Sequence, residues 1–127
     1  MKYQNLRDRT FRFAVGTIAF CRKLPDRWEA RRIAGQLFDA GTSVGANYRA
    51  SQRARSDREF VSKIGLVIEE SDESAFWLEL IEASQICVSS EQQALLKEAG
   101  ELRAIFVASR ATAQKKIASK AARRKPE

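Results

Sequence analysis

Hydrophobic positions recur at intervals of three and four residues along most of this chain, which is the spacing of one face of an α-helix. Three rows keep this spacing: Ala34, Leu37, Gly41, Val44 and Tyr48; Phe60, Ile64, Val67, Ser71, Ser74, Leu78 and Ile81; and Leu95, Ala99, Leu102, Phe106, Ser109 and Ala113. Clusters of β-branched residues are few, and the 127 residues include 2 Pro and 6 Gly. The pattern predicts an all-α protein of one domain.

Helix start signals divide the chain into four helices. Asn5 is placed to cap the first, and each of the other three begins with a polar residue followed three positions later by Glu or Gln, as in a capping box. These pairs are Asp26 and Glu29, Ser56 and Glu59, and Ser90 and Gln93. The expected helices span 5–23, 27–52, 57–87 and 91–120, with 121–127 as a frayed basic tail. Short connections predict an antiparallel four-helix bundle over residues 1–120.

Two helices carry more apolar residues than one core requires. The first helix has two stripes and the third has three apolar residues outside its row: Phe11, Ala14, Val15 and Ile18; Phe13, Thr17, Phe20 and Leu24; and Phe76, Trp77 and Leu80. A wide core-facing arc explains them, and so does burial against other subunits. We expect a homo-oligomer.

Three glycines, Gly35, Gly41 and Gly45, lie inside the second helix. Each costs about 1 kcal/mol relative to Ala in a helix interior. We expect them to allow close backbone approach to a neighbouring helix; the alternative is a loop between two shorter helices.

The net charge of +7 is divided into basic, acidic and basic segments. Residues 1–58 hold 13 Lys and Arg against 5 Asp and Glu, residues 59–102 hold 2 against 10, and residues 103–127 hold 8 against 1. Such a division favours pairing between oppositely charged segments, within or between subunits. It also leaves basic surface for an anionic partner.

Catalytic residues are hard to find in this sequence. It has no His, so the commonest general base and zinc ligand is missing. Cys21 and Cys87 lie far apart, and we expect both to be reduced and buried. The start of the chain lacks a signal peptide, and no apolar run approaches the ~18 residues of a membrane span. We expect a cytoplasmic protein that is not an enzyme and needs no cofactor.

The segment VGANYRASQRARSDREF, residues 44–60, raises the question of nucleic-acid binding. Its end is architecture, because Ser56 and Glu59 form a capping pair. Asn47 is placed to set helix register, bonding backbone or a partner helix, or else faces solvent. Arg49, Arg53 and Arg55 either contact phosphates or pair with the acidic third helix.

A second basic group lies in the fourth helix and the tail. Its members are Arg103, Arg110, Lys115, Lys116, Lys120, Arg123, Arg124 and Lys125. In a symmetric oligomer they would repeat in every subunit and favour backbone contacts to RNA or DNA. A solvated tail that aids solubility is the alternative.

The third helix holds six carboxylates that raise the question of a metal site: Glu69, Glu70, Asp72, Glu73, Glu79 and Glu82. Metal-binding bundles add Glu-x-x-His from other helices, whereas this chain has no His and no other helix offers a second inward cluster of carboxylates. Ion pairing is the expected role. Glu70 and Asp72 point about 200° apart, so one can face a basic neighbour in its own subunit and the other an adjacent subunit.

A resemblance runs from about Phe11 to Ile86, and more loosely to about residue 118. It is carried by Gly41, Ser43, Val44, Asn47, Tyr48, Arg49, Arg55, Ser56, Glu59, Phe60, Glu70, Asp72, Glu73, Trp77, Leu78 and Leu80. These positions resemble the 23S rRNA-intervening-sequence proteins. The resemblance implies a left-handed up-down-up-down bundle, and some members assemble as ring-like homopentamers. Here Ala50 and Ser51 replace the Glu and Gly of the NIAEG run common elsewhere, which puts any role of those residues in doubt.

The resemblance extends to a related branch, the accessory variability determinant of diversity-generating retroelements. That protein is a basic ring that binds nucleic acid and works with a reverse transcriptase, so a reverse transcriptase is an implied partner if one is encoded nearby. The family carries no established catalytic residues. Residues expected to serve structure and assembly are Asn47, Tyr48, Ser56, Glu59, Glu70, Asp72, Glu73 and Trp77.

The sequence thus favours a non-enzymatic homo-oligomer that contacts RNA or DNA phosphates. The expected contacts are Arg49, Arg53, Arg55, Arg103, Arg110, Lys115, Lys116 and Lys120. The alternative is a protein-interaction scaffold whose charges serve self-assembly without nucleic acid. A metal-dependent enzyme is a third interpretation and would require a bound ion.

Overall fold

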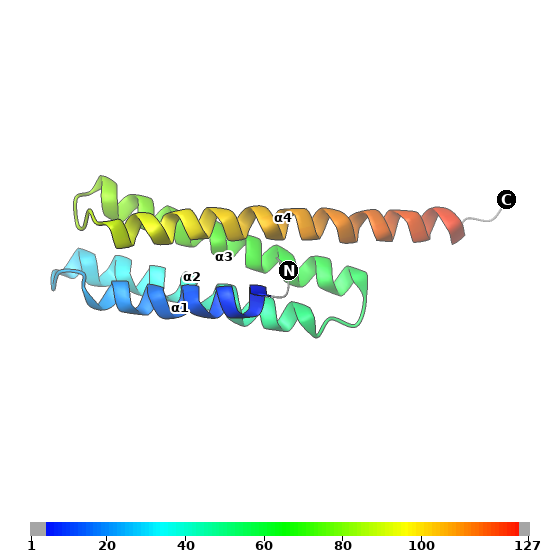
Figure 1. Ribbon diagram of the computed structural model, residues 1–127, viewed down its shortest axis with the longest axis horizontal. Helices are drawn as coiled ribbons and strands as arrows, with labels where there is room; N and C mark the ends of the chain where they lie inside the picture. Colours follow the sequence, from blue (N-terminus) through cyan, green and yellow to red (C-terminus); the bar gives the residue numbers. More distant parts are fainter. Residues whose placement is uncertain (1–4, 125–127) are drawn as a thin grey trace.

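A computed structural model describes residues 5–124 as four α-helices joined by short turns (Figure 1). The helices are α1 (Leu6–Arg22), α2 (Trp28–Gln52), α3 (Asp57–Ala83) and α4 (Ser90–Arg124). No strand occurs in residues 5–124. The predicted all-α four-helix bundle is confirmed.

Each helix packs against two others, so that α1, α2, α3 and α4 surround one core in chain order. In the described residues the diagonal pairs, α1 with α3 and α2 with α4, make no close backbone approach. Contacts show that neighbours run in opposite directions: Thr17 lies at Gly41 and Thr10 at Gly45 between α1 and α2, and Asp72 pairs with Arg103 and Asp57 with Lys120 between α3 and α4. This arrangement is compatible with the predicted up-down-up-down topology, and the handedness of the bundle stays a prediction.

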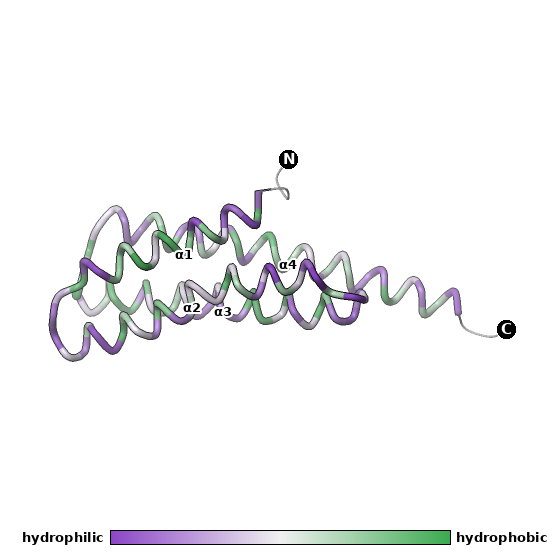
Figure 2. Tube along the Cα trace, turned by 90° about the horizontal axis from the view of Figure 1, so that it is seen from below, coloured by the Kyte–Doolittle hydropathy of each residue, from purple (hydrophilic) through white to green (hydrophobic). Residues whose placement is uncertain are grey.

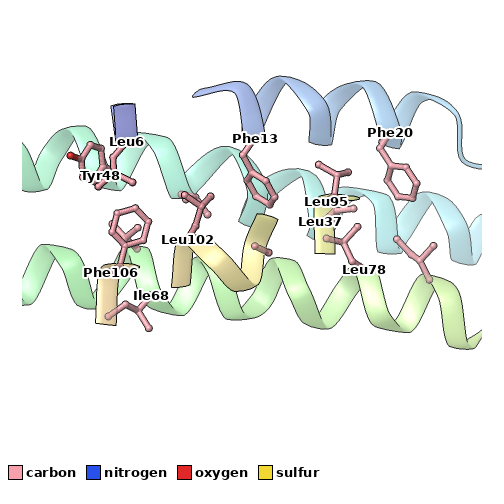
Figure 3. Packing of buried hydrophobic residues seen from close by; sticks show 14 of the residues in the cluster. Leu6, Phe13, Phe20, Leu37, Tyr48, Ile68, Leu78, Leu95, Leu102 and Phe106 are labelled. Atoms are coloured by element: carbon pink, nitrogen blue, oxygen red, sulfur yellow. The ribbon is translucent and has the colours of Figure 1, made fainter. Parts of the chain in front are cut away.

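The core combines the predicted rows of α2, α3 and α4 with Leu6, Phe13 and Phe20 of α1 (Figure 3). Leu37, Leu78, Leu102 and Phe106 are fully buried, and Phe106 packs against Tyr48 with ring centroids 5.5 Å apart. Apolar residues line the inner side of every helix, and hydrophilic residues predominate towards the C-terminal end of α4 (Figure 2). The core therefore follows the hydrophobic period of the sequence.

Helix α1 uses only one of its two apolar stripes in this core. Phe13, Thr17 and Phe20 are buried. Phe11 and Val15 of the other stripe remain 52% and 51% exposed. The second apolar stripe of α1 therefore points away from the bundle. The explanation of both stripes as one wide core-facing arc does not hold for α1.

The buried hydroxyl groups of the core are satisfied within their own helices. Thr10, Thr17, Ser71 and Ser74 each donate to the carbonyl oxygen four residues earlier, all at 2.8 Å. The cost of burying these groups is thereby offset without bonds between helices. Small polar side chains can then occupy core positions where two helices come close.

Helices α1 and α2 come close at two glycines, as predicted. A Cβ added to Gly41 would lie 2.7 Å from Thr17 Cγ2, and one added to Gly45 would lie 3.3 Å from the carbonyl oxygen of Thr10. Within residues 5–124, no helix of the same chain comes close to Gly35, where an added Cβ would meet nothing within 4 Å. Because α2 is continuous from Trp28 to Gln52, the alternative of a loop at these glycines is wrong.

Only one of the predicted helix caps is found where it was expected. Ser56 precedes α3, and its Oγ accepts a hydrogen bond from the Glu59 N–H at 3.0 Å. Asn5 and Arg27, which precede α1 and α2, make no side-chain cap bond. Asp26 lies one position too early to cap α2, and its carboxylate pairs with Arg31 instead.

The last cap and two helix ends also differ from expectation. Ser89, not Ser90, caps α4, because its Oγ accepts from the Gln92 N–H at 3.1 Å. Helix α3 ends at Ala83 rather than 87, since the chain turns at Gln85 with φ of 61°. Residues 121–124 of the expected tail are helical, and 125–127 lie outside the described residues. No helix of residues 5–124 is long and apolar enough to cross a membrane.

Candidate nucleic-acid interface

The antiparallel packing brings two basic segments, distant in the sequence, to one end of the bundle. Residues 49–58 form the end of α2, the turn and the start of α3, and residues 110–124 form the C-terminal part of α4. Together they contain ten Lys and Arg and one acid, Asp57. Lys120 Nζ donates to Asp57 Oδ2 at 2.8 Å, which joins the two segments. We call these segments the basic end.

The α2–α3 turn presents arginines to solvent. Arg53 follows the last residue of α2, and its N–H donates to the Ala50 carbonyl at 3.1 Å. The capping bond from Ser56 then starts α3 three residues later. The Arg55 side chain is 89% exposed, and its Nε lies 3.9 Å from Glu59, too far for a hydrogen bond. Arg53 and Arg55 are therefore accessible to a large ligand.

Helix α4 adds two further rows of exposed cations. Lys116, Lys120 and Arg124 are spaced four residues apart, about 6 Å along the helix axis. Lys115 and Arg123 are exposed on the neighbouring row. Because Asp57 opens α3 and is bonded to Lys120, the last turn of α4 projects beyond the rest of the bundle (Figure 1).

A groove of about 750 Å³ separates the start of α3 from α4. Its walls include Ser109, Thr112, Lys116 and Lys120 from α4, with Arg55 and Phe60 on the opposite side. Hydroxyl, ammonium and guanidinium groups are all hydrogen-bond donors, whereas phosphate oxygens are acceptors. The groove therefore offers the donors that a nucleic-acid backbone requires.

The positive charge of the basic end changes the pKa of Asp57, the one acid that it contains. The hydrogen bond from Lys120 lowers the pKa of the Asp57 carboxyl, and the charges of Lys120 and Lys116 add to the effect. A positive field that stabilises this carboxylate also favours other anions nearby.

Three predicted phosphate contacts occupy different surroundings. Arg49 lies over the ring of Phe11, with 5.4 Å between guanidinium carbon and ring centroid, at the outer edge between α1 and α2. Arg103 pairs with Asp72 of α3, farther from the basic end. Arg110 is half-buried. The structure thus brings together Arg53, Arg55, Lys115, Lys116 and Lys120, and places the other three less favourably.

Sequence reasoning left Arg58 out of the expected contacts. It is exposed and lines a second hollow with Arg55, Lys120 and Arg124. Its position inside a capping motif drew attention to the architecture of α3. The signal that identifies it is topological, because the start of α3 must lie beside the end of α4 in an antiparallel bundle.

The residues predicted to serve structure divide into core and surface. Tyr48 is a core residue, and burial raises the pKa of its phenol. Trp77 is half-buried and meets Phe76 edge-on, with centroids 4.9 Å apart. Asn47 Nδ2 donates to the Ser43 carbonyl of its own helix at 2.9 Å. Asn47 therefore bonds backbone but sets no register between helices of this chain.

The acidic residues of α3 separate as their spacing suggested. Asp72 pairs with Arg103 of the same chain. Glu70 has no basic partner in the described residues, and burial, followed by repulsion from Glu73 and Glu69, raises its pKa. No group of three or more metal-ligating side chains converges in residues 5–124. The two cysteines are free and half-buried.

Comparison with known proteins gives a family and a fold. The sequence model described as 23S rRNA-intervening sequence protein matches residues 4–108. A solved structure from Bacteroides thetaiotaomicron, described as a protein of unknown function from the S23 ribosomal protein family, superposes with a TM-score of 0.75. It is 23% identical, and the match covers 81% of this chain and 95% of that one. No curated protein matches this chain.

Proposed function

The chain belongs to the 23S rRNA-intervening sequence protein family, and we propose that it is a non-enzymatic, homo-oligomeric protein that binds the phosphate backbone of RNA or DNA. The basic end is the proposed contact surface. A ring-like assembly would place one basic end per subunit around an axis. The expected stoichiometry is a pentamer.

One observation carries this proposal: ten Lys and Arg, against one acid, gather at one end from two distant segments. Acids elsewhere neutralise many of the other cations. Arg9 binds Glu98, Lys23 binds Glu91, and Arg103 binds Asp72. At the basic end the only interhelical ion pair in the described residues joins Lys120 to Asp57. The exposed cations there are available to an external anion: Arg53, Arg55, Arg58, Lys115, Lys116, Arg123 and Arg124.

The chemistry of the basic end favours backbone contact rather than base recognition. Its cations stand on an exposed helix and a turn. To recognise the bases of a duplex, a helical bundle would have to insert a helix into the major groove. There, Arg, Asn or Gln side chains would hydrogen-bond to the base edges. The two exposed rows of α4 contain Lys115, Lys116 and Lys120, which contact phosphates as point charges, and Arg123 and Arg124 follow only in the last turn. Binding is therefore expected to be insensitive to sequence and strongly dependent on salt.

Fluorescence anisotropy of a labelled, structured RNA tests the proposal at 50 mM and 200 mM salt. With six or more phosphates contacted per assembly, affinity should fall by about 10³-fold or more between the two conditions. The test variant carries Lys115→Glu and Lys116→Glu. The control variant carries Lys23→Glu and Lys97→Glu, which change the net charge equally and lie outside the basic end.

The test variant should lose at least tenfold in affinity at 50 mM salt and show a shallower salt slope, because two cations per subunit are reversed. The control should bind within a few-fold of the unaltered protein. Equal losses in both variants would overturn the basic end as the contact surface. No binding by the unaltered protein at 50 mM salt would overturn nucleic-acid binding itself and favour the protein-interaction scaffold.

A further inference from the structure

Two exposed apolar faces lie on different sides of the bundle. The first is formed by α1 and α2, with Phe11, Val15 and Ile18 on α1 and Trp28 and Phe38 on α2. The second is formed by α3, with Leu66, Phe76 and Leu80. Within each helix the members recur at helical spacing, and Phe11, Val15, Trp28, Phe38, Leu66 and Phe76 are each between 44% and 70% exposed.

The first face is continuous across two helices. Phe11 meets Arg49 of α2, and Phe38 lies eleven residues before Arg49, only about 20° away around α2. Val15 and Ile18 follow Phe11 at spacings of four and three, so they point the same way. The cations at the edge of this face include Arg7, Arg22 and Arg49, none with an acidic partner in the described residues.

The second face has acids where the first has arginines. Leu66, Glu69, Glu73, Phe76 and Leu80 are spaced by three, four, three and four residues, which forms an outward row on α3. Its glutamates lie between apolar residues, and Trp77 packs against Phe76 beside them.

Most of the unpaired acids of the described residues belong to α3, and Glu69 and Glu73 lie in its outward row. In residues 5–124, six carboxylates have no Lys or Arg nitrogen within 4.0 Å, and all six belong to α2 or α3. They are Asp39, Glu69, Glu70, Glu73, Glu79 and Glu82. Repulsion from Glu73, Glu69 and Asp39 contributes to the raised pKa of Glu70, so these carboxylates are close enough to disfavour one another.

We propose that the α1–α2 face of one copy docks onto the α3 face of the next copy, in a head-to-tail interface. The inference rests on the self-assembly in the proposed function and assigns its surfaces. Charge selects this pairing. Two α1–α2 faces would bring arginines together, and two α3 faces would bring glutamates together, whereas the mixed pair joins opposite charges around an apolar centre.

The fold also favours a closed ring over a dimer. Helices α1 and α3 are diagonal in the bundle, and in the described residues they make no close approach. Their outward faces therefore point away from each other, so one neighbour cannot cover both. Each copy needs two neighbours, which gives a ring when the rotation between copies closes.

A glycine on each face fits close approach by another chain. Gly35 lies seven residues after Trp28, and Gly65 lies four residues before Glu69, so each shares a helix face with these residues. An added Cβ would meet nothing within 4 Å at either position. No packing within the chain requires either glycine. The third such glycine, Gly100, lies on α4 and on neither face.

The test uses one blocking substitution on each face of the full chain. Val15→Asp adds an acid to the α1–α2 face, where it would meet the glutamates of the partner. Phe76→Lys adds a cation to the α3 face, where it would meet arginines. Val88→Asp is the control, because Val88 is 64% exposed in the α3–α4 turn, on neither face. Multi-angle light scattering after size exclusion gives the mass, and circular dichroism verifies the fold.

Each blocked variant alone should fall to the mass of a single chain, 14.3 kDa. An equimolar mixture of the two should form complexes of at least two chains, because one intact face remains on each variant and the two substituted side chains carry opposite charges. The Val88→Asp control should keep the mass of the unaltered oligomer. This mixing result separates a head-to-tail interface from a two-fold one.

Other outcomes overturn the inference. If one blocked variant stays assembled while the other dissociates, the interface pairs a face with itself. If both stay assembled, neither face is used. A single-chain mass for the unaltered protein removes self-assembly altogether. RNA binding is read separately by anisotropy, so its loss in the unaltered protein refutes the proposed function while leaving the interface result intact.

Discussion

Replacing Gly41 with Ala tests how tightly α1 and α2 are packed. The added Cβ would lie 2.7 Å from both Cγ2 and Oγ1 of Thr17, and 3.0 Å from Thr17 Cβ. Favourable carbon contacts need about 3.5–4.0 Å. Rotation of Thr17 gives little relief, because its Cβ is itself too close and its hydroxyl is bonded to the Phe13 carbonyl at 2.8 Å. The two helices must therefore separate.

The magnitude follows from two opposing effects. Overpacking of a tight core costs about 1–3 kcal/mol, whereas replacing a mid-helix Gly by Ala gains about 1 kcal/mol. Gly100→Ala is the matched control, because it has the same propensity gain and nothing lies within 4 Å of its added Cβ. Subtracting the two variants removes the propensity effect, and we expect Gly41→Ala to be less stable than Gly100→Ala by about 1–3 kcal/mol.

Urea unfolding followed by circular dichroism at 222 nm measures this difference. All variants must be compared at one chain concentration, because assembly contributes to apparent stability. Adding Thr17→Ala to Gly41→Ala removes two of the three close atoms and should recover part of the loss, a coupling of about 1 kcal/mol. If Gly41→Ala were as stable as Gly100→Ala, the close approach at Thr17 would not be a constraint on the bundle.

Two further substitutions probe the junction of α3 and α4. Gln92 is fully buried, its Nε2 donates to the Leu78 carbonyl at 2.9 Å, and its Oε1 has no partner in the described residues. In Gln92→Glu, burial would raise the pKa of the new carboxyl, so its stability should match the unaltered protein most nearly below about pH 4 and fall as pH rises, by about 3–4 kcal/mol at pH 7. A loss of the same size at every pH, in urea titrations from pH 4 to 8, would contradict this. Ser89→Ala should cost about 1 kcal/mol by removing the cap of α4, whereas Ser90→Ala should cost a few tenths at most; the reverse order in thermal melts would move the cap to Ser90.

The periodic rows of α2, α3 and α4 could be predicted because core positions on these helices are apolar and surface positions are not. Helix α1 could not be resolved in the same way. Its two stripes are about equally apolar, and only the fit of Thr17 against Gly41 shows which faces the core. The adjacent residues Ser89 and Ser90 raise a similar ambiguity, since either serine can cap a helix. Which of them caps α4 depends on where the backbone becomes helical, and the sequence does not show this.

The sequence contained a signal for the full length of α4. Residues 111–124 are rich in Ala, Lys and Arg, which are strong helix formers, and α4 contains no Pro. The composition of residues 121–127 nevertheless suggested a frayed basic tail. In the structure the helix continues to Arg124, with Arg123 and Arg124 in its last turn, where cations interact favourably with the helix dipole. The extension carries part of the basic end.

The candidate surfaces depend on topology more than on any motif. Arg53 and Lys116 are 63 positions apart, and only antiparallel packing of α2, α3 and α4 places them at the same end. Likewise, Glu70 and Asp72 are two residues apart, yet Asp72 faces Arg103 of its own chain and Glu70 faces no cation in the described residues. The two-residue spacing predicts that the two side chains point in different directions. Only the packing of the helices determines that Asp72, and not Glu70, has a basic partner in the described residues.

Arg49 lies where the two proposed surfaces meet, and this limits what its substitution can show. It belongs to the segment that forms the basic end, yet its guanidinium covers Phe11 on the α1–α2 face. Reversing its charge would weaken phosphate binding directly, and it would also weaken assembly, which lowers binding by removing neighbouring basic ends. Arg53 and Lys116 touch neither apolar face. Loss of RNA binding at unchanged oligomer mass in Arg53→Glu would therefore assign phosphate contact to the basic end independently of assembly, which substitution of Arg49 cannot do.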